Sequence, residues 1–337
     1  MRNFPRLFLA VASLLSLGQG YEYQCEPGTD PTVCSLWNVQ YVQNGTQLSV
    51  KMSSNVKEVR LNMEQYYYER HLGITVYDSF LHVTILHNPA SVHVGHNRIK
   101  ELHMPTDLQT GEFIKSSISK VHTNSSLSYA VTYLDLQGNS IYDISSLSAL
   151  VNLQTLNLEN NYISEINGTI FTSMRNLSML YLGYNRFQKL DFKVFPKSLS
   201  NLWLCRNRLN VLDLVNVSLP SLTVLDVESN NLKTIDVVAV FAALPGLQFL
   251  PIAQNKFYES EAKRIIAELN RHNVSHYFGN ADPYCDPSEY EVSKICFPGS
   301  GLIGRSVWKA LMLLVILVIL VAIFAGSVRW IWFQMRY

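Results

Sequence analysis

The chain has almost no excess of charge of either sign. Its 27 lysine and arginine residues nearly balance its 26 aspartate and glutamate residues, which gives a formal net charge of +1. Nucleic-acid-binding domains carry a basic surface that contacts phosphate groups, and this composition supplies none. Nucleic acid is therefore not an expected partner.

Motifs of the common enzyme classes are also missing. The sequence holds no P-loop, no nucleophile elbow and no HExxH zinc motif. The segment GSGLIG (299–304) does match G-x-G-x-x-G, but it follows no expected strand, so we interpret 299–306 as a flexible stalk. We predict a protein that is not an enzyme and has no cofactor.

Charge is absent altogether from residues 310–328. A helix of these 19 residues, at about 1.5 Å per residue, spans roughly the 30 Å of a hydrocarbon core. Trp308 and Lys309 at one edge and Arg329 and Trp330 at the other are typical interfacial anchors. We therefore predict a transmembrane helix over 307–328 and a cytoplasmic tail over 329–337. A lipid-anchor signal is the alternative, but such signals usually end in the apolar run.

The first 20 residues resemble a secretory signal peptide. Arg2 and Arg6 precede a short apolar core, and Gly18 to Gly20 offers small residues for cleavage. With the C-terminal helix, this predicts a single-pass type I protein of the cell membrane with an extracellular ectodomain. Six N-x-S/T sequons also favour a glycoprotein. They lie at Asn44, Asn124, Asn167, Asn176, Asn216 and Asn273.

An internal repeat fills the middle of the chain. The template L-x-x-L-x-L-x-x-N-x-L recurs, most clearly as LQTLNLENNYI from Leu153 and LSMLYLGYNRF from Leu177. The paired leucines point into a core, and the asparagine satisfies backbone groups where the chain turns. The template asparagines are Asn139, Asn161, Asn185, Asn207, Asn230 and Asn255. We predict an α/β-type leucine-rich-repeat solenoid over 56–258, with a curved parallel sheet and a short irregular or helical convex side.

Upstream of residue 131 the pattern weakens. SVHVGHNRI around Asn97 fits the template with valines, whereas 111–128 fits it poorly. We interpret this part as either a degenerate repeat or a loop.

Cysteines are scarce, with five in the chain. Cys25 and Cys34 lie in a turn-rich loop that we assign to an N-terminal cap over 21–55. Cys285 and Cys296 follow an expected amphipathic helix (259–269) in a C-terminal cap over 259–298. Local pairing within each cap is the simplest of the three connectivities. Cys205 is then left over, as a partly shielded free thiol or as the site of a disulfide-linked dimer.

The candidate binding surface is the concave face of the sheet. The position between the paired leucines points away from the core, and it carries His93, Asp135, Asn157, Tyr181, Trp203, Asp226 and Pro251 in successive repeats. Neighbouring outward positions add Tyr133, Tyr184, Arg206, Glu228 and Phe249. Aromatic residues and arginine anchor many protein interfaces. We predict that the ligand-binding residues are Tyr133, Asp135, Tyr181, Tyr184, Trp203, Arg206, Asp226 and Glu228. Cross-strand stabilisation of the sheet is the alternative role for the aromatic residues.

Histidines form a loose cluster in the N-terminal half of the chain. They are His82, His87, His93, His96 and His103. Without cysteine or carboxylate partners at ligand spacing, we assign no metal site to them.

The cap YQCEPGTDPTVCSLWNV, the imperfect LxxLxLxxN repeats and the cysteine-bearing C-terminal cap resemble the insect leucine-rich-repeat immune proteins, in particular their membrane-anchored mosquito subgroup. Secreted members of that family carry an adjacent cysteine pair and a long coiled coil, and neither is present here. The resemblance implies a binding protein of innate defence without enzymatic activity. We predict that the ectodomain binds an extracellular protein or microbial ligand, and that with so short a tail the chain needs a co-receptor or acts by adhesion or sequestration. A cell-adhesion or developmental receptor or co-receptor is the alternative function.

Overall fold

The computed structural model describes residues 21–26, 28–41, 48–64, 73–168, 170–277, 285–286, 289–298, 311–321 and 323–326. The predicted signal peptide, stalk and cytoplasmic tail, and the sequon at Asn44, lie outside these residues.

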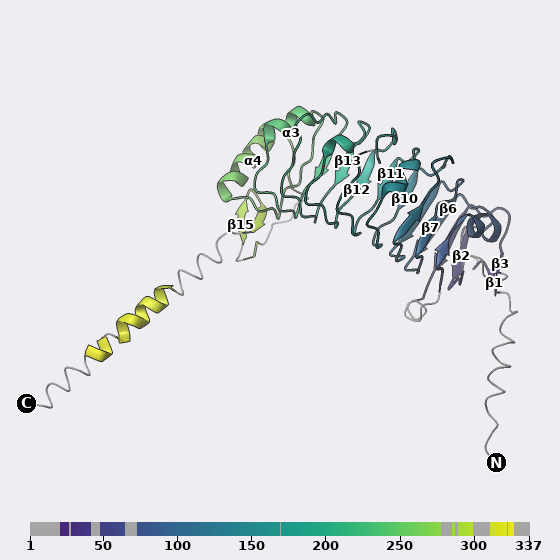
Figure 1. Ribbon diagram of the computed structural model, residues 1–337, viewed down its shortest axis with the longest axis horizontal. Helices are drawn as coiled ribbons and strands as arrows, with labels where there is room; N and C mark the ends of the chain where they lie inside the picture. The colour runs from purple at the N-terminus through teal and green to yellow at the C-terminus, as the bar shows by residue number, and fades with distance from the viewer. Residues whose placement is uncertain are drawn as a thin grey trace, which may run out of the picture.

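A nine-stranded parallel sheet runs through the molecule, with the order β14-β13-β12-β11-β10-β8-β6-β4-β2. The strands are β2 (Val33–Trp37), β4 (Glu58–Asn62), β6 (Ser91–Gly95), β8 (Thr110–Ile114), β10 (Tyr133–Asp135), β11 (Thr155–Asn157), β12 (Met179–Tyr181), β13 (Asn201–Trp203) and β14 (Val224–Asp226). Each strand pairs with the next one in the stack without an antiparallel break. Figure 1 shows the resulting coils stacked in an arc. The predicted solenoid with a parallel sheet is confirmed.

The leucine pattern forms the core as predicted. In β12 and β13 the central leucines, Leu180 and Leu202, are fully buried, and so are Leu182 and Leu204 just after the strands. The next coil supplies the same residues one layer further on, so the apolar core runs unbroken through the stack. No coil buries its leucines alone, which is the physical basis of repeat proteins.

The template asparagines also act as predicted. The Nδ2 of Asn185 donates to the carbonyl oxygens of Leu158 (2.9 Å) and Leu182 (3.2 Å), and its Oδ1 accepts from the amide of Ile163 (3.0 Å). Asn161, Asn207, Asn230 and Asn255 repeat this arrangement. One buried side chain therefore joins two coils and satisfies backbone groups of both.

The segments that connect the strands form short elements on the other side of the coils. A second parallel sheet holds β5 (Val76–Tyr77), β7 (Glu101–His103) and β9 (Lys120–His122). The helical turn η1 (Phe80–Ile85) follows β5 directly. Further along the chain come the helical turns η2 (Ser145–Ala149) and η3 (Phe192–Val194) and the helix α3 (Val237–Ala243).

Segment 111–128, which fits the repeat template poorly, contains a degenerate repeat and is not only a loop. Gly111 and Phe113 of β8 take the two core positions of the template. Ser116 replaces the asparagine, because its hydroxyl donates to the carbonyls of Val94 and Ile114. Gly111 fits because a Cβ there would come within 2.8 Å of the Phe113 ring. The template did not identify this repeat in the sequence, because Gly111 replaces a leucine and Ser116 replaces the asparagine.

Both ends of the core are closed as predicted. At the N-terminal end β1 (Tyr21–Gln24) pairs with β3 (Leu48–Lys51), and Cys25 is bonded to Cys34. At the C-terminal end α4 (Glu259–Arg271) buries Ala262, Ile265, Ile266 and Leu269. The hairpin of β15 (Glu289–Val292) and β16 (Ile295–Pro298) follows, with Cys285 bonded to Cys296. Both predicted pairings are confirmed.

Residues 311–321 and 323–326 are helical. Among the residues that the structure describes, no helix has both the length and the apolar character needed to cross a bilayer.

Candidate functional site

The open face of the nine-stranded sheet, the side turned away from the core, carries a continuous row of side chains. Strand register aligns, in order, Ser35, Arg60, His93, Glu112, Asp135, Asn157, Tyr181, Trp203 and Asp226. The predicted column from His93 to Asp226 is therefore one row, as expected. Sequence reasoning missed Glu112, Arg60 and Ser35, because the template is degenerate in their repeats.

Two aromatic side chains stack in the middle of this row. Tyr181 on β12 lies directly opposite Trp203 on β13, with ring centroids 4.0 Å apart and planes 1° apart. Both side chains are half-buried. The parallel strands hold the rings at nearly the strand spacing, so they form one rigid apolar platform on an otherwise polar face.

Asp226 is next to the platform on one side, and Asp135 lies beyond Asn157 on the other. Asp135 and Asp226 belong to the same row, and both were expected to be exposed. That expectation is wrong, because they are only 6% and 3% exposed. Their side chains fold back onto the strand ends, where Asp135 Oδ1 accepts from the Gln137 amide (2.8 Å) and Asp226 Oδ1 from the Glu228 amide (2.9 Å). A short carboxylate that turns back in this way is covered by its larger neighbours. Pro251, also expected to face outward, is buried as well.

A further row lies just past the strand ends. Backbone hydrogen bonds align Glu159 with Gly183, Gly183 with Cys205 and Cys205 with Glu228. Gly183 leaves space that its neighbours use, because a Cβ there would lie 3.0 Å from both Cys205 Sγ and Glu159 Oε1. The thiol of Cys205 is therefore half-buried among carboxylates and is not paired with another cysteine among the described residues.

Burial and mutual repulsion raise the pKa values of these acids. Desolvation is the main cause for Asp226, whose pKa rises to about 6, with further repulsion from Glu228 and Glu159. Burial likewise raises the pKa of Glu159 and Glu228, although Arg206 opposes the change at Glu228. The same environment raises the pKa of the Cys205 thiol to about 12. A cation that binds between carboxylates held so close together lowers the electrostatic free energy of the charged group.

We call Glu159, Tyr181, Trp203, Asp226 and Glu228 the aromatic–acidic patch. Its edge carries Tyr184, 48% exposed, with the Arg206 guanidinium 5.1 Å from the ring centroid. Tyr133, the remaining predicted residue, is half-buried on β10, two strands from Tyr181. Six of the eight predicted residues thus lie on or just beyond β12, β13 and β14, whereas Tyr133 and Asp135 lie on β10.

The predicted histidine cluster does not form. His82 is fully buried and bonds through Nδ1 to the Tyr77 hydroxyl (2.8 Å). His93 lies on the open face between Glu112 (2.6 Å) and Glu58 (3.5 Å). His103 is on β7 of the other sheet, beside His122, which sequence reasoning did not single out.

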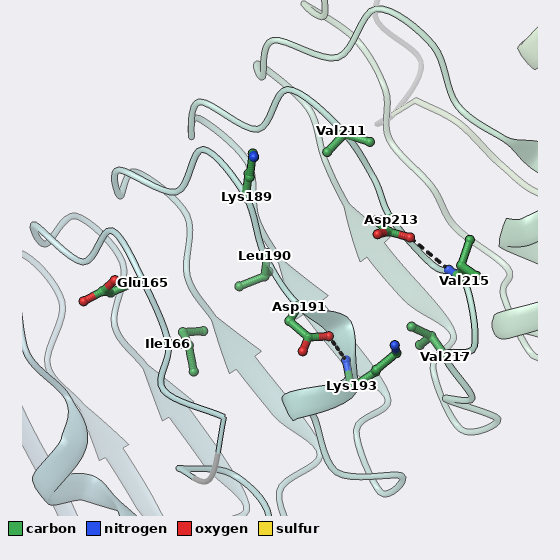
Figure 2. Close-up of a pocket in the computed structure, with 10 residues that line it drawn as sticks. All are labelled: Glu165, Ile166, Lys189, Leu190, Asp191, Lys193, Val211, Asp213, Val215 and Val217. Atoms are coloured by element: carbon green, nitrogen blue, oxygen red, sulfur yellow. Dashed lines mark hydrogen bonds between the residues drawn. The ribbon is translucent and has the colours of Figure 1, made fainter.

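A groove of about 430 Å³ lies on the connecting segments of three successive coils (Figure 2). Its Asp191 and Asp213 accept hydrogen bonds from the amides of Lys193 and Val215 and so close local turns. Because these carboxylates already serve the backbone, we assign no ligand to the groove.

The five sequon asparagines within the described residues are all exposed. They are Asn124, Asn167, Asn176, Asn216 and Asn273. None of them belongs to the strands of the nine-stranded sheet, so attached glycans would leave those strands free.

Comparison with known proteins was made on sequence and on structure. Residues 151–195 and 197–257 match the family described as "Leucine rich repeat", and residues 130–169 match "Leucine Rich repeats (2 copies)". Lumican of Gallus gallus is 28% identical over 165 residues, which cover 48% of this chain and 46% of lumican. Human "Leucine-rich repeats and immunoglobulin-like domains protein 1" is 29% identical over 171 residues, or 48% of this chain and 16% of that protein. The chain thus spans less than half of these relatives, and they are not insect proteins.

Among solved structures, the leucine-rich repeat domain of APL1B aligns with a TM-score of 0.53 and 20% identity over 89% of this chain and all of that one. The LRIM1/APL1C complex aligns with a TM-score of 0.50 and 15% identity, over 90% of this chain and 76% of that one. At such identities the likeness concerns the fold alone. The family matches, the row of hydrogen-bonded template asparagines (the asparagine ladder) and the fold agree that residues 130–257 form leucine-rich repeats.

Proposed function

We propose that this chain is an extracellular binding protein that holds a protein ligand against the open face of its sheet. The observation that carries the proposal is the aromatic–acidic patch. A rigid pair of stacked rings offers apolar contact area at little entropic cost, and three half-buried or buried carboxylates stand beside it. A ligand segment with lysine or arginine next to an apolar side chain complements such a surface.

Charge around the patch favours a basic ligand over an acidic one. Glu112 and Asp135 extend the acidic character along the same row, whereas Arg206 is the cation at the patch edge. Burial raises the pKa values of Asp226 and Glu228, and repulsion from Glu228 and Glu159 adds to the effect at Asp226. A bound lysine or arginine would stabilise the charged carboxylates, and this contributes to affinity. Catalysis plays no part in the proposal.

We further propose that the chain is a glycoprotein anchored in the cell membrane by 307–328, with the ectodomain outside. The apolar run, the signal-peptide pattern and the exposed sequons support this topology. A co-receptor is a further partner that we propose for this ectodomain. Protease protection of the tail in sealed vesicles, with enzymatic deglycosylation, tests the topology; a tail cleaved from outside would contradict it.

The biological setting we propose is insect innate immunity, with a protein or microbial ligand. The resemblance of the caps and repeats to insect immune proteins supports it, and the fold likeness to APL1B is compatible with it. The alternative is a cell-adhesion or developmental receptor, which the sequence similarity to proteins outside insects makes worth testing. Expression that does not change on immune challenge, and no ligand in challenged extracellular fluid, would contradict the immune setting.

Binding itself is tested with the full-length chain displayed on cells. Extracellular fluid is applied, and the retained protein is measured for the wild type and for a Tyr181→Ala/Trp203→Ala variant. Val211→Ala/Val215→Ala, in the groove of Figure 2, is the matched control. We expect retention to fall at least tenfold for the first variant only. Equal retention by all three chains would overturn the proposal.

A further inference from the structure

We propose that Glu101, His103 and His122 form a binding site for a divalent transition metal, with zinc the preferred ion. The three residues lie on the second sheet, away from the aromatic–acidic patch. The site is therefore independent of the proposed ligand-binding surface.

The strand register brings the three side chains together. β7 and β9 are parallel neighbours in which His103 is opposite His122 and Leu102 is opposite Val121. Leu102 and Val121 are buried, so the residues on either side of them point away from the core. Glu101 precedes His103 by two residues and thus shares its face. Consecutive coils supply the ligands, two from β7 and one from β9.

The distances fit a small tetrahedral ion. Glu101 Oε2 lies 3.2 Å from Nε2 of His122 and 3.6 Å from Nε2 of His103. Donor atoms bound to zinc at 2.0–2.1 Å with tetrahedral angles are about 3.3 Å apart. All three donor atoms lie within 4.8 Å of one another. The carboxylate oxygen is thus already at the right separation from both nitrogens.

The two imidazole rings are arranged as a pair. Their centroids are 4.2 Å apart and their planes differ by 7°. Both rings turn the Nε2 edge toward Glu101. Because the lone pairs of parallel rings do not converge, the rings must rotate out of this stacked arrangement when both bind one ion. The residues are only half-buried, which leaves solvent access to a fourth ligand position.

One of the three donor atoms has no hydrogen-bond partner among the residues that the structure describes. Nε2 of His103 is enclosed but makes no hydrogen bond, since Glu101 lies beyond hydrogen-bonding distance. An ion bound beside the Glu101 carboxylate would satisfy this buried nitrogen.

Other histidine and cysteine groups in the described residues lack this geometry. Glu58 and Glu112 contact opposite ring nitrogens of His93, so the three cannot converge on one ion. The sulfur atoms near Glu289 are joined in the Cys285–Cys296 disulfide and cannot serve as thiolate ligands. A metal at Glu101 would tie β7 to β9 and so clamp two coils of the N-terminal half together.

The test uses the full-length chain, purified in detergent, stripped with a chelator and titrated with zinc chloride in a calorimeter. We expect one zinc ion per chain and a higher melting temperature with zinc than without it. In His103→Gln and in His122→Gln, affinity should fall at least a hundredfold and the zinc-dependent rise in melting temperature should vanish. His96→Asn is the matched control, because His96 is exposed and its φ of 55° suits asparagine. It should bind zinc like the wild type.

A second measurement avoids variants altogether. In the wild type, zinc should protect His103 and His122, but not His96, from diethyl pyrocarbonate, as read by mass spectrometry. Zinc binding that survives in the His103→Gln/His122→Gln double variant would overturn the proposal. So would equal modification of His103 and His122 with and without zinc.

Discussion

Some charged side chains on the open face are buried, although residues of their type are usually exposed. Asp226 looks like a surface residue in the repeat pattern, yet it is 3% exposed. Its carboxylate closes a turn onto the Glu228 amide and also accepts from the Cys205 thiol. The acid and the thiol therefore share one half-buried environment, and each changes the titration of the other.

Replacement of Asp226 by asparagine should stabilise the fold at neutral pH. The folded-state pKa of about 6 exceeds the ordinary 3.8, so the fold prefers the protonated acid, and the wild type loses stability as pH rises from about 4 to 6. Asparagine keeps the turn and carries no charge. The free energy of unfolding at pH 7 should rise by up to roughly 3 kcal/mol, and the gain should shrink toward pH 4.

Urea denaturation at several pH values measures this gain. Asp213→Asn is the control, because Asp213 closes the same kind of turn but is exposed. It should change stability by less than about 0.5 kcal/mol. Equal behaviour of the two variants would contradict the account.

The Cys205 thiol should be unreactive. A pKa of about 12, against an ordinary 9, lowers the thiolate fraction at neutral pH about a thousandfold. Alkylation by iodoacetamide in the native chain should therefore be slower than in the denatured chain by two to three orders of magnitude. Of the two roles considered for Cys205, the geometry favours the shielded free thiol. A disulfide-linked dimer on a non-reducing gel, abolished by Cys205→Ser, would contradict this.

At the scale of elements, the asparagine ladder and the paired leucines determine which segments become strands. Both signals are local and strict in phase, so the strands from β10 to β14, the buried face of α4 and the two disulfides could be predicted from the sequence. The segment around β8 could not be settled, because Gly111 and Ser116 occupy positions where leucine and asparagine are expected. Contacts with neighbouring coils, not local pattern, hold those residues in place.

The ladder makes a quantitative prediction. Asn185→Ala leaves the carbonyl of Leu158 and the amide of Ile163 without their buried partner. At about 1–3 kcal/mol for each of these two unsatisfied buried groups, the free energy of unfolding should fall by roughly 2–6 kcal/mol. Asn210→Ala, at an exposed position three residues beyond Asn207, is the control. Chemical denaturation of the full-length chain measures both, and a small effect at Asn185 would contradict the assigned role.

Side-chain environment, unlike the strands, was only partly predictable. The row from His93 to Asp226 follows from the strand period, but the burial of Asp135 and Asp226 depends on turns that each carboxylate makes with a following amide. The meeting of Glu101, His103 and His122 depends on the register of β7 and β9, in repeats where the template is weakest. A sequence period places residues on a face, whereas neighbouring coils decide how exposed they are.

At the scale of the whole molecule, nine short strands form one long sheet, and the sheet presents a broad surface. The disulfide-bonded caps close the ends of the core, and the exposed sequons lie outside the sheet strands. The aromatic–acidic patch lies toward the C-terminal end of this sheet, on and just beyond β12, β13 and β14. An electrostatic component to ligand binding there should weaken with added salt.

The central claim, that this face binds a protein ligand, is tested most directly by site-specific photo-cross-linking. A photoreactive phenylalanine analogue replaces Tyr184, at the patch edge, or Tyr142, an exposed residue on the connection between β10 and β11. The full-length chain is displayed on cells in extracellular fluid and irradiated. The account predicts a discrete adduct from position 184 that is lost with Trp203→Ala, and none from position 142. Adducts of equal yield from both positions, or an adduct at 184 that persists without Trp203, would contradict it.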